Sequence, residues 1–295
     1  MSGPRRVITV DDLGTAIAGH EAEGYRLVTI SPADDPRRAD MDGPDAIRLE
    51  RRAGAAAAEG RAGMVYRDLI PDRLGGAVIA SHITIPEGGP VPDYVHHHDI
   101  SFQMIFCHAG WVRVVYEDQG APFVMGPGDA VLQPPGIRHR VLESGDGLEV
   151  VEVGSPAEHD THREHDLALP TPLLRPERDF GGQRFVRHVH DDAGWSPGPA
   201  TGWEQQVFGL AAATGRRAEA RVVRVVDGSG PWEVRHPDSG PVFVFVRDGA
   251  VAVVAPDPSS RLEVGDTAVF AGDGLCSLRG DPSGELLVVD LPVPD

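Results

Sequence analysis

The chain has 295 residues, enough for one large or two ordinary domains, and its 41% apolar content is ordinary for a globular protein. Its formal net charge of −18 repels phosphate backbones, so nucleic acid is not an expected partner. All 27 Lys and Arg positions are arginine, which excludes lysine Schiff-base enzymes and the lysine-containing P-loop.

The N-terminal part predicts a helix followed by a loop. The helix would run from Thr9 to about Ala22, with Thr9 and Asp12 in a capping-box-like start and Gly24 as its stop. Segment 32–63, rich in Asp, Arg, Ala and Gly, predicts a loop or a poorly ordered hairpin. No apolar run follows the charged start, and none approaches the roughly 18 residues of a membrane helix. We therefore expect a cytoplasmic protein without a membrane partner.

From Met64 onwards, two blocks of β-rich runs flank a polar, proline-studded stretch. The runs are short and end at Gly and Pro, which favours antiparallel strands closed into a sandwich or barrel. The second block repeats two segments of the first: FQMIFCHAGWVRVVY pairs with VFVFVRDGAVAVVA, and FVMGPGDAVLQPPG with SRLEVGDTAVFAGDG. An internal duplication is the simplest explanation. The predicted division is an N-terminal extension over 1–63, a barrel over 64–158, a linker over 159–182 and a second barrel over 183–295.

Histidines and a glutamine gather in the first block. His96 and His98 are two positions apart, so their side chains leave the same face of one strand, and His97 leaves the opposite face. Gln103 opens the next strand, and His139 follows a later Pro-Pro-Gly turn. In a closed antiparallel barrel, the side chains on the inner face can converge on one interior point.

The spacing of these residues resembles the two motifs of the cupin superfamily. The matching residues are Gly89, His96, His98 and Gly110 for the first motif, and Gly128, Pro134, Gly136 and His139 for the second. Six residues instead of the usual five follow Gly89, and Glu143 stands where the second motif has Asn. The resemblance implies an all-β chain of two cupin barrels in tandem, each a double-stranded β-helix of jelly-roll type, after an N-terminal helical or irregular extension.

The resemblance also implies one divalent transition metal as cofactor. Its ligands would be His96, His98 and His139, with Gln103 as a weaker fourth where the family usually has Glu. Iron is the first choice, with Ni, Mn, Co and Zn as alternatives. Held by neutral ligands alone, the ion would keep its full +2 charge and favour an anionic, chelating substrate. A satisfied polar pocket without metal is the alternative interpretation.

The second copy lacks this ligand set. Aligning the glycines of the two copies puts at the four ligand positions Arg235, Pro237, Val242 and Cys276. This combination cannot bind a divalent ion as the first set can. We therefore expect the second barrel to be structural, either covering the first or supplying the surface of a homodimer.

Neighbouring side chains are candidates for the substrate pocket. Tyr94 shares the face of the two ligand histidines on its strand, His82 lies on a preceding strand, and Arg113 follows a glycine turn. These three are the candidate catalytic residues, with Gln133 and a carboxylate-clamping Arg67 beside them. The alternative for each is an ordinary strand residue, because a register slip of one position reverses every face.

Three further histidines and one cysteine could be reactive, but we expect them to have structural roles. His159, His162 and His165 repeat every three residues and could bind a metal from a helix, but we interpret their acidic segment as a solvated linker. Cys107 has the strand parity of Gln103 and is interpreted as a small apolar filler rather than a nucleophile.

The functional hypothesis rests on the resemblance. It implies a mononuclear non-haem metal enzyme, with dioxygenase-type chemistry on a small anionic or enolisable metabolite as the leading choice. Open coordination positions would take the substrate oxygens and O₂. A Lewis-acid isomerase, epimerase or lyase of a sugar acid or keto acid is one alternative. A non-catalytic small-molecule-binding cupin is another.

Overall fold

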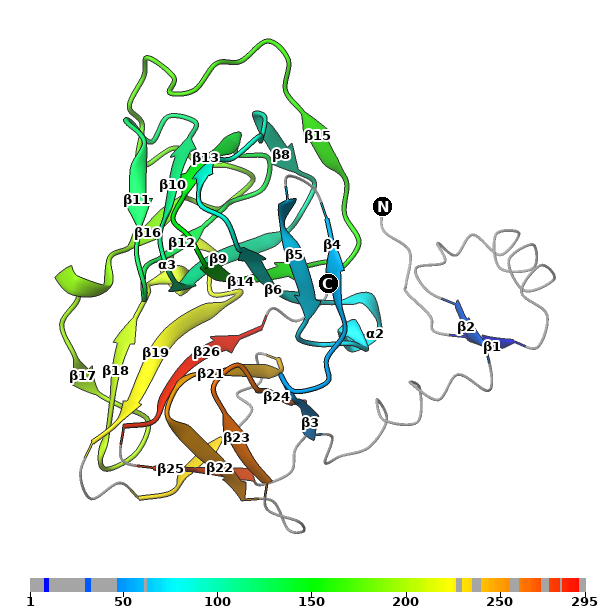
Figure 1. Cartoon of the computed structure of the whole chain (residues 1–295), viewed down its shortest axis with the longest axis vertical. Helices are drawn as coiled ribbons and strands as arrows, with labels where there is room; N and C mark the ends of the chain where they lie inside the picture. The colour runs from blue at the N-terminus through cyan, green and yellow to red at the C-terminus, as the bar shows by residue number, and fades with distance from the viewer. Residues whose placement is uncertain are drawn as a thin grey trace.

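The computed structural model describes residues 47–60, 63–226, 230–234, 240–254, 260–271, 276–281 and 283–291. It also describes the backbone of two short strands, β1 (Ile8–Val10) and β2 (Ile30–Pro32), which pair in parallel. Thr9 therefore belongs to a strand, and the rest of the helix predicted up to Ala22 lies outside the described residues. Figure 1 shows two β-barrels, one above the other, and most strands of the upper barrel precede those of the lower barrel in the chain.

The upper barrel consists of two facing sheets. The larger sheet has the order β16-β12-β9-β14-β6-β5-β4. Its strands are β4 (Ala57–Glu59), β5 (Val65–Asp68), β6 (Ile79–Ile85), β9 (Phe102–Ala109), β12 (Ala130–Leu132), β14 (Leu148–Ser155) and β16 (Val186–His188). The smaller sheet has the order β11-β10-β13-β8-β15, with β7 beside β13. Its strands are β7 (Gly89–Pro90), β8 (His96–His98), β10 (Val112–Tyr116), β11 (Phe123–Met125), β13 (His139–Ser144) and β15 (Thr161–Arg163).

The lower barrel repeats this plan. Its larger sheet contains β17 (Ser196–Pro197), β18 (Trp203–Val207), β19 (Glu219–Val225), β26 (Glu285–Asp290), β21 (Val242–Asp248), β24 (Thr267–Phe270) and β3 (Ile47–Glu50), in that order. Its smaller sheet contains β20 (Trp232–Val234), β25 (Cys276–Gly280), β22 (Ala250–Val254) and β23 (Ser260–Glu263). The described helices are short, namely α2 (Arg73–Gly76), α3 (Leu210–Ala213) and the 3₁₀ turn η3 (His190–Asp192).

Two glycine turns recur in both barrels and support the predicted duplication. Gly110 and Gly249 end equivalent strands with φ of 70° and 62°, and Gly128 and Gly265 adopt 94° and 86°. These positive values favour glycine because a Cβ would meet the neighbouring backbone. The hydrogen bonds match as well: Gly128 N–H donates to the carbonyl of Cys107, and Gly265 N–H donates to that of the equivalent Val246.

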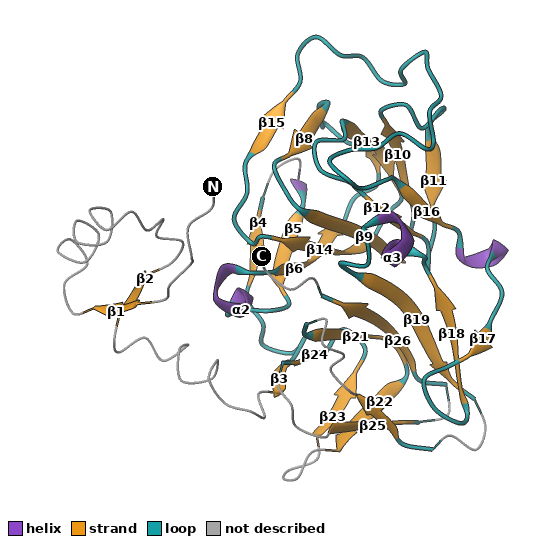
Figure 2. Cartoon of the chain, turned by 180° about the vertical axis from the view of Figure 1, so that it is seen from behind, coloured by secondary structure: helices purple, strands orange, loops and turns teal. Residues whose placement is uncertain are grey.

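The larger sheets of the two barrels pack face to face and form an inter-barrel core. Along β9, successive side chains enter two different apolar environments, as the strand period of two requires. The contributors to the inter-barrel core include Phe102, Met104 and Phe106 of β9, Phe243 and Phe245 of β21, and Val222 of β19. Helix α3 lies at this junction, as Figure 2 shows from behind, and buries Leu210 there. The opposite face of β9 is thereby left to line the interior of the first barrel.

Strand pairing crosses the segment boundaries predicted from the sequence. Strand β3, from the predicted extension, pairs with β24 of the second barrel, whereas β16, from the predicted second barrel, pairs with β12 of the first. The predicted linker contains β15, which pairs with β8. None of the helices that the structure describes has the length and apolar content needed to cross a membrane.

A buried histidine at the junction predicts sensitivity to acid. The side chain of His108 is 9% exposed, and its ring lies 5.0 Å from that of Phe245. Burial lowers the pKa of His108 to about 4 from an ordinary 6.5, because desolvation outweighs the attraction of Glu149. The unfolded chain binds this proton at a higher pH than the folded chain. The contribution of neutral, buried His108 to the free energy of unfolding is therefore complete above pH 6.5 and is lost as pH falls towards 4.

Replacing this imidazole should make the metal-free protein less sensitive to acid. In His108→Gln, we expect the free energy of unfolding to fall less steeply between pH 6.5 and 4, by up to roughly 1.4 kcal/mol per pH unit. Urea titrations at several pH values measure this slope. The exposed His165→Gln serves as the control and should keep the wild-type slope. Equal slopes for wild type and His108→Gln would contradict the assignment.

Candidate metal centre

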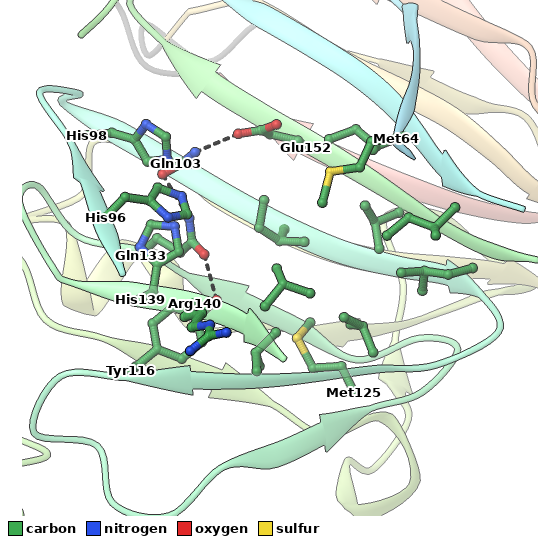
Figure 3. Close-up of a pocket in the computed structure, with 18 of the residues that line it drawn as sticks. Met64, His96, His98, Gln103, Tyr116, Met125, Gln133, His139, Arg140 and Glu152 are labelled. Carbon is green, nitrogen blue, oxygen red and sulfur yellow. Dashed lines mark hydrogen bonds between the residues drawn. The ribbon is translucent and has the colours of Figure 1, made fainter. Parts of the chain in front are cut away.

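A pocket lies inside the first barrel between its two sheets, with about 100 Å³ of space that the centres of water-sized molecules can occupy. Most of its wall is apolar. The apolar lining consists of Met64, Tyr66, Ile83, Ile85, Ile105, Val112, Val114, Met125, Val141, Leu148 and Val150. Figure 3 shows polar side chains gathered at one end, where β8, β9 and β13 meet. The pocket therefore joins a polar end to a larger apolar chamber.

Three imidazoles form the polar end. His96 and His98 project from β8, and His139 begins the neighbouring strand β13, where it pairs directly with His96. The ring centroids lie 4.3 Å apart for His96 and His139, 5.1 Å for His96 and His98, and 5.3 Å for His98 and His139. One ring nitrogen from each lies within 4.8 Å of the other two. This spacing suits three ligands around one ion.

Each of these rings is held from behind through its Nδ1 atom. His96 Nδ1 lies 2.8 Å from the carbonyl oxygen of Tyr94, and His139 Nδ1 lies 3.1 Å from that of Ile137. His98 Nδ1 lies 2.9 Å from the hydroxyl oxygen of Thr161 on β15. A carbonyl only accepts, so it selects the tautomer with the proton on Nδ1 and leaves Nε2 as the neutral donor atom on the far side of the ring.

Gln103 belongs to a chain of hydrogen bonds along the pocket wall. The hydroxyl of Tyr116 donates to Gln133 Oε1 at 2.6 Å, and Gln133 Nε2 donates to Gln103 Oε1 at 2.8 Å. Gln103 Nε2 then donates to Glu152 Oε1 at 2.5 Å, as Figure 3 shows. An amide oxygen has two lone pairs, so Gln103 Oε1 retains one for a metal.

The two residues at the ends of this chain of hydrogen bonds fix which group donates in each bond. At one end, burial raises the pKa of Tyr116 well above its ordinary value, so its phenol remains a donor. At the other end, a carboxylate at Glu152 can only accept. The amides between them therefore each have one permitted orientation, and Gln103 presents its oxygen, not its nitrogen, away from Glu152.

The side chains at the polar end fit a divalent transition metal. Imidazole suits Fe, Ni, Cu and Zn, and metal-bound histidines usually direct their second ring nitrogen to an outer oxygen. His96 and His139 do so with carbonyls and His98 with a hydroxyl. His96, His98 and His139 could therefore hold one ion, with Gln103 beside them. This set is uncharged, so it would leave the positive charge of the ion uncompensated.

Comparison with known proteins places this barrel in a family. Residues 81–154 match the family model described as a cupin domain. The first barrel is a cupin. With the second barrel, the chain has the bicupin fold, as the resemblance of its motifs had implied. No curated protein matches the chain.

Several solved structures share the bicupin fold. The E. coli protein Ylba has a TM-score of 0.59 at 11% identity, over 84% of this chain and 92% of its own. The oxalate decarboxylase of Lactobacillus farciminis gives 0.60 and 14%, over 83% and 86%. The salicylate 1,2-dioxygenase of Pseudaminobacter salicylatoxidans gives 0.58 and 15%, over 95% and 94%. At these identities the likeness establishes the fold alone.

The three candidate catalytic residues lie outside the lining of this pocket. Arg113 is on the outer face of β10, between the inward Val112 and Val114, and pairs with Glu143 at 3.0 Å. His82 is on the face of β6 that meets the second barrel, where its Nε2 lies 2.8 Å from Glu149. Strand alternation explains both positions, since their neighbours face the pocket.

Tyr94, Arg67 and Cys107 also contact other parts of the protein and do not line the pocket. Tyr94 precedes β8, and its ring lies under the guanidinium of Arg163 at 4.6 Å. Arg67 is buried and donates to the carbonyl of Gly265 at 3.0 Å, which ties the barrels together instead of clamping a substrate. Burial raises the pKa of Cys107 to about 12, so its thiol stays protonated and inert, in agreement with the predicted filler role.

Three polar pocket residues were not expected from the sequence, and one of them is Arg140 on β13. Glu152 and Tyr116 both line the pocket next to predicted residues, namely Gln103 and Gln133. Glu152 lies two and four positions after Val150 and Leu148 on β14, and this spacing could have predicted that all three face the pocket. The signal is weak, because β14 is covered on both faces and its sequence shows no clean alternation.

In the second barrel, the described equivalents of the ligands are apolar in character. Val242 and Cys276 belong to its buried core, and burial raises the pKa of Cys276 to about 11. Arg235 and Pro237 lie outside the described residues.

Removing the hydroxyl behind His98 should weaken metal binding at the centre. Thr161→Val keeps the β-branched shape but deprives His98 Nδ1 of its partner, so we expect the dissociation constant for Zn²⁺ to rise by about 10-fold to 100-fold. Competition with a chromophoric chelator measures this constant. Thr161→Ser keeps the hydroxyl and should bind like wild type. An unchanged constant in Thr161→Val would show that this contact does not orient the ring.

Proposed function

We propose that the first cupin is a mononuclear, metal-dependent enzyme, with His96, His98 and His139 as ligands and Gln103 as a weaker fourth. The observation that carries this proposal is that all three Nδ1 atoms lie within 3.1 Å of an outer oxygen, while one ring nitrogen of each histidine lies within 4.8 Å of those of the other two. A binding pocket without chemistry has no need of three imidazoles held in this way. Iron is the proposed metal, as the ion that serves oxygenase chemistry with imidazole ligands and open positions.

The charge of the pocket suggests the substrate class. When bound, the metal supplies a Lewis acid with open coordination positions for substrate oxygens. The four ligand side chains bring no negative charge, which favours a substrate that chelates as an anion. The apolar chamber beside the ligands, lined by Ile83, Ile105 and Val150 among others, would take the apolar body of that substrate.

Glu152 is the group proposed to move a proton. It carries the only carboxylate among the described residues that line the pocket. Its Oε1 accepts the hydrogen bond of Gln103, so Oε2 is the oxygen left to take a proton from an enolisable substrate. Gln103 would thus hold the base in place with its nitrogen while its oxygen faces the ligand histidines.

The arrangement favours dioxygenase-type chemistry on a small enolisable metabolite with an apolar side. Removal of a proton by Glu152 would give the electron-rich enolate form that reacts with O₂. A Lewis-acid isomerase or lyase acting on a keto acid is the second candidate, because it would use the same carboxylate as its base. A sugar acid fits less well, since the apolar chamber offers few partners for its hydroxyl groups.

Glu152→Gln should separate proton transfer from metal binding. The substitution keeps the shape of the side chain, so we expect metal content to remain at the wild-type level while kcat falls by about 10² to 10⁴. His98→Ala should lose both metal and turnover. Metal analysis and O₂ uptake with Fe²⁺-loaded protein and a panel of diketones and enediols measure these quantities.

Glu143→Gln is the matched control, because its carboxylate pairs with Arg113 on the outer face of the barrel. It should match wild type in both assays. Turnover without O₂ uptake would reject the oxygenase proposal and leave the Lewis-acid candidate. No stoichiometric metal in wild type after repletion would reject a metal enzyme altogether.

A further inference from the structure

A second group of ligand-type side chains lies on the outer face of β8. His97 points away from the pocket, and β15 pairs with β8 so that His162 stands directly opposite it. Asp99 follows β8, and its N–H donates to the carbonyl of Asp160, the residue before β15, at 3.0 Å. We call His97, Asp99 and His162 the outer cluster.

The side chains of the outer cluster converge. The rings of His97 and His162 stack with centroids 5.1 Å apart, and His162 Nε2 lies 2.9 Å from Asp99 Oδ2. One ligand-type atom from each of the three lies within 4.8 Å of the other two. Asp99 and His162 are open to solvent, with side chains 65% and 45% exposed, so an ion would reach them directly from solvent and replace their mutual hydrogen bond.

One atom of the cluster lacks a partner. His97 Nδ1 is buried and has no hydrogen bond within the described part of the chain. Burying a polar atom without a partner costs free energy, so such atoms call for an explanation. The positive charge of Arg138 acts on His97, and its guanidinium lies within 3.7 Å of Glu117 and 3.4 Å of Glu164. These two carboxylates offset its repulsion of a cation at the cluster.

We propose that the outer cluster binds a second divalent transition metal, of the Zn²⁺ type. Two imidazoles and one carboxylate, with a fourth position left to water, form a ligand set that Zn²⁺ accepts. The proposal does not depend on the reaction in the pocket. It makes β8 a strand with metal ligands on both faces, His96 and His98 inward and His97 outward.

The outer ion would join β8 to β15. The same strand pair carries the contact between Thr161 and His98. An ion that fixes His162 against His97 would therefore also hold the hydroxyl of Thr161 against the ligand ring. Occupancy of the outer site would strengthen the inner one, and the inner affinity should fall when the outer ligands are removed.

Zn²⁺ stoichiometry of the full chain tests the proposal. Calorimetric titration with Zn²⁺ alone should give two equivalents for wild type, one for His97→Gln/His162→Gln and one for His96→Ala/His98→Ala. His165→Gln, on the same exposed segment, should keep two. If the outer double variant still binds two equivalents, the outer site is rejected. One equivalent in wild type with none in the inner double variant rejects it as well.

Hydrogen exchange gives a second readout that does not require the inner variants to be stable. Adding Zn²⁺ should slow amide exchange over residues 159–166 in wild type and in Asp166→Asn, a control outside the cluster. It should have no such effect in His97→Gln/His162→Gln or in Asp99→Asn. Protection that persists in these variants would overturn the proposal. Loss of the inner site alone would leave this protection intact, so failure of the proposed enzyme is distinguishable.

Discussion

The face-to-face packing of the two larger sheets is the contact on which the metal centre depends. It buries Phe102, Met104 and Phe106 of β9 between the barrels. Because successive residues of a strand point in opposite directions, this anchorage leaves Gln103 and Ile105 no alternative to the interior of the first barrel. The second barrel thus sets the register of a strand whose other face lines the pocket.

At the two described positions that correspond to ligands, the second barrel has core packing in place of ligand side chains. Val242 and Cys276, which stand where Gln103 and His139 stand in the first copy, are buried in its core. Filling that interior with apolar side chains stabilises the barrel through burial of apolar surface. The first barrel instead keeps polar groups and open space inside.

Much of the fold could be predicted from the sequence because glycine turns and strand alternation are local signals. The turns at Gly110 and Gly249 reveal the duplication, and the spacing of His96 and His98 defines an inward face. Domain boundaries were harder to predict. Strands β3 and β16 pair with the barrel on the other side of a predicted boundary. The sequence of so short a segment does not indicate which distant strand it pairs with.

Side chains on strands covered from both sides were the least predictable. His82 and Glu152 are both polar residues on central strands, yet one meets the second barrel and the other lines the pocket. Without an exposed face, polarity does not alternate, so the sequence does not show which side is which. The segment predicted as a linker contains the three-residue strand β15, which is too short to display a period.

The last hydrogen bond of the chain from Tyr116 to Glu152 joins Gln103 to Glu152, two positions that the sequence keeps 49 residues apart. A glutamate at position 103 would have no N–H to donate to Glu152, and two carboxylates would then face each other in a buried wall. Gln103 and Glu152 are therefore best regarded as one unit. The negative charge that most cupins place on the metal ligand has moved across to the adjacent strand. There it no longer needs to neutralise an ion and is available to a substrate.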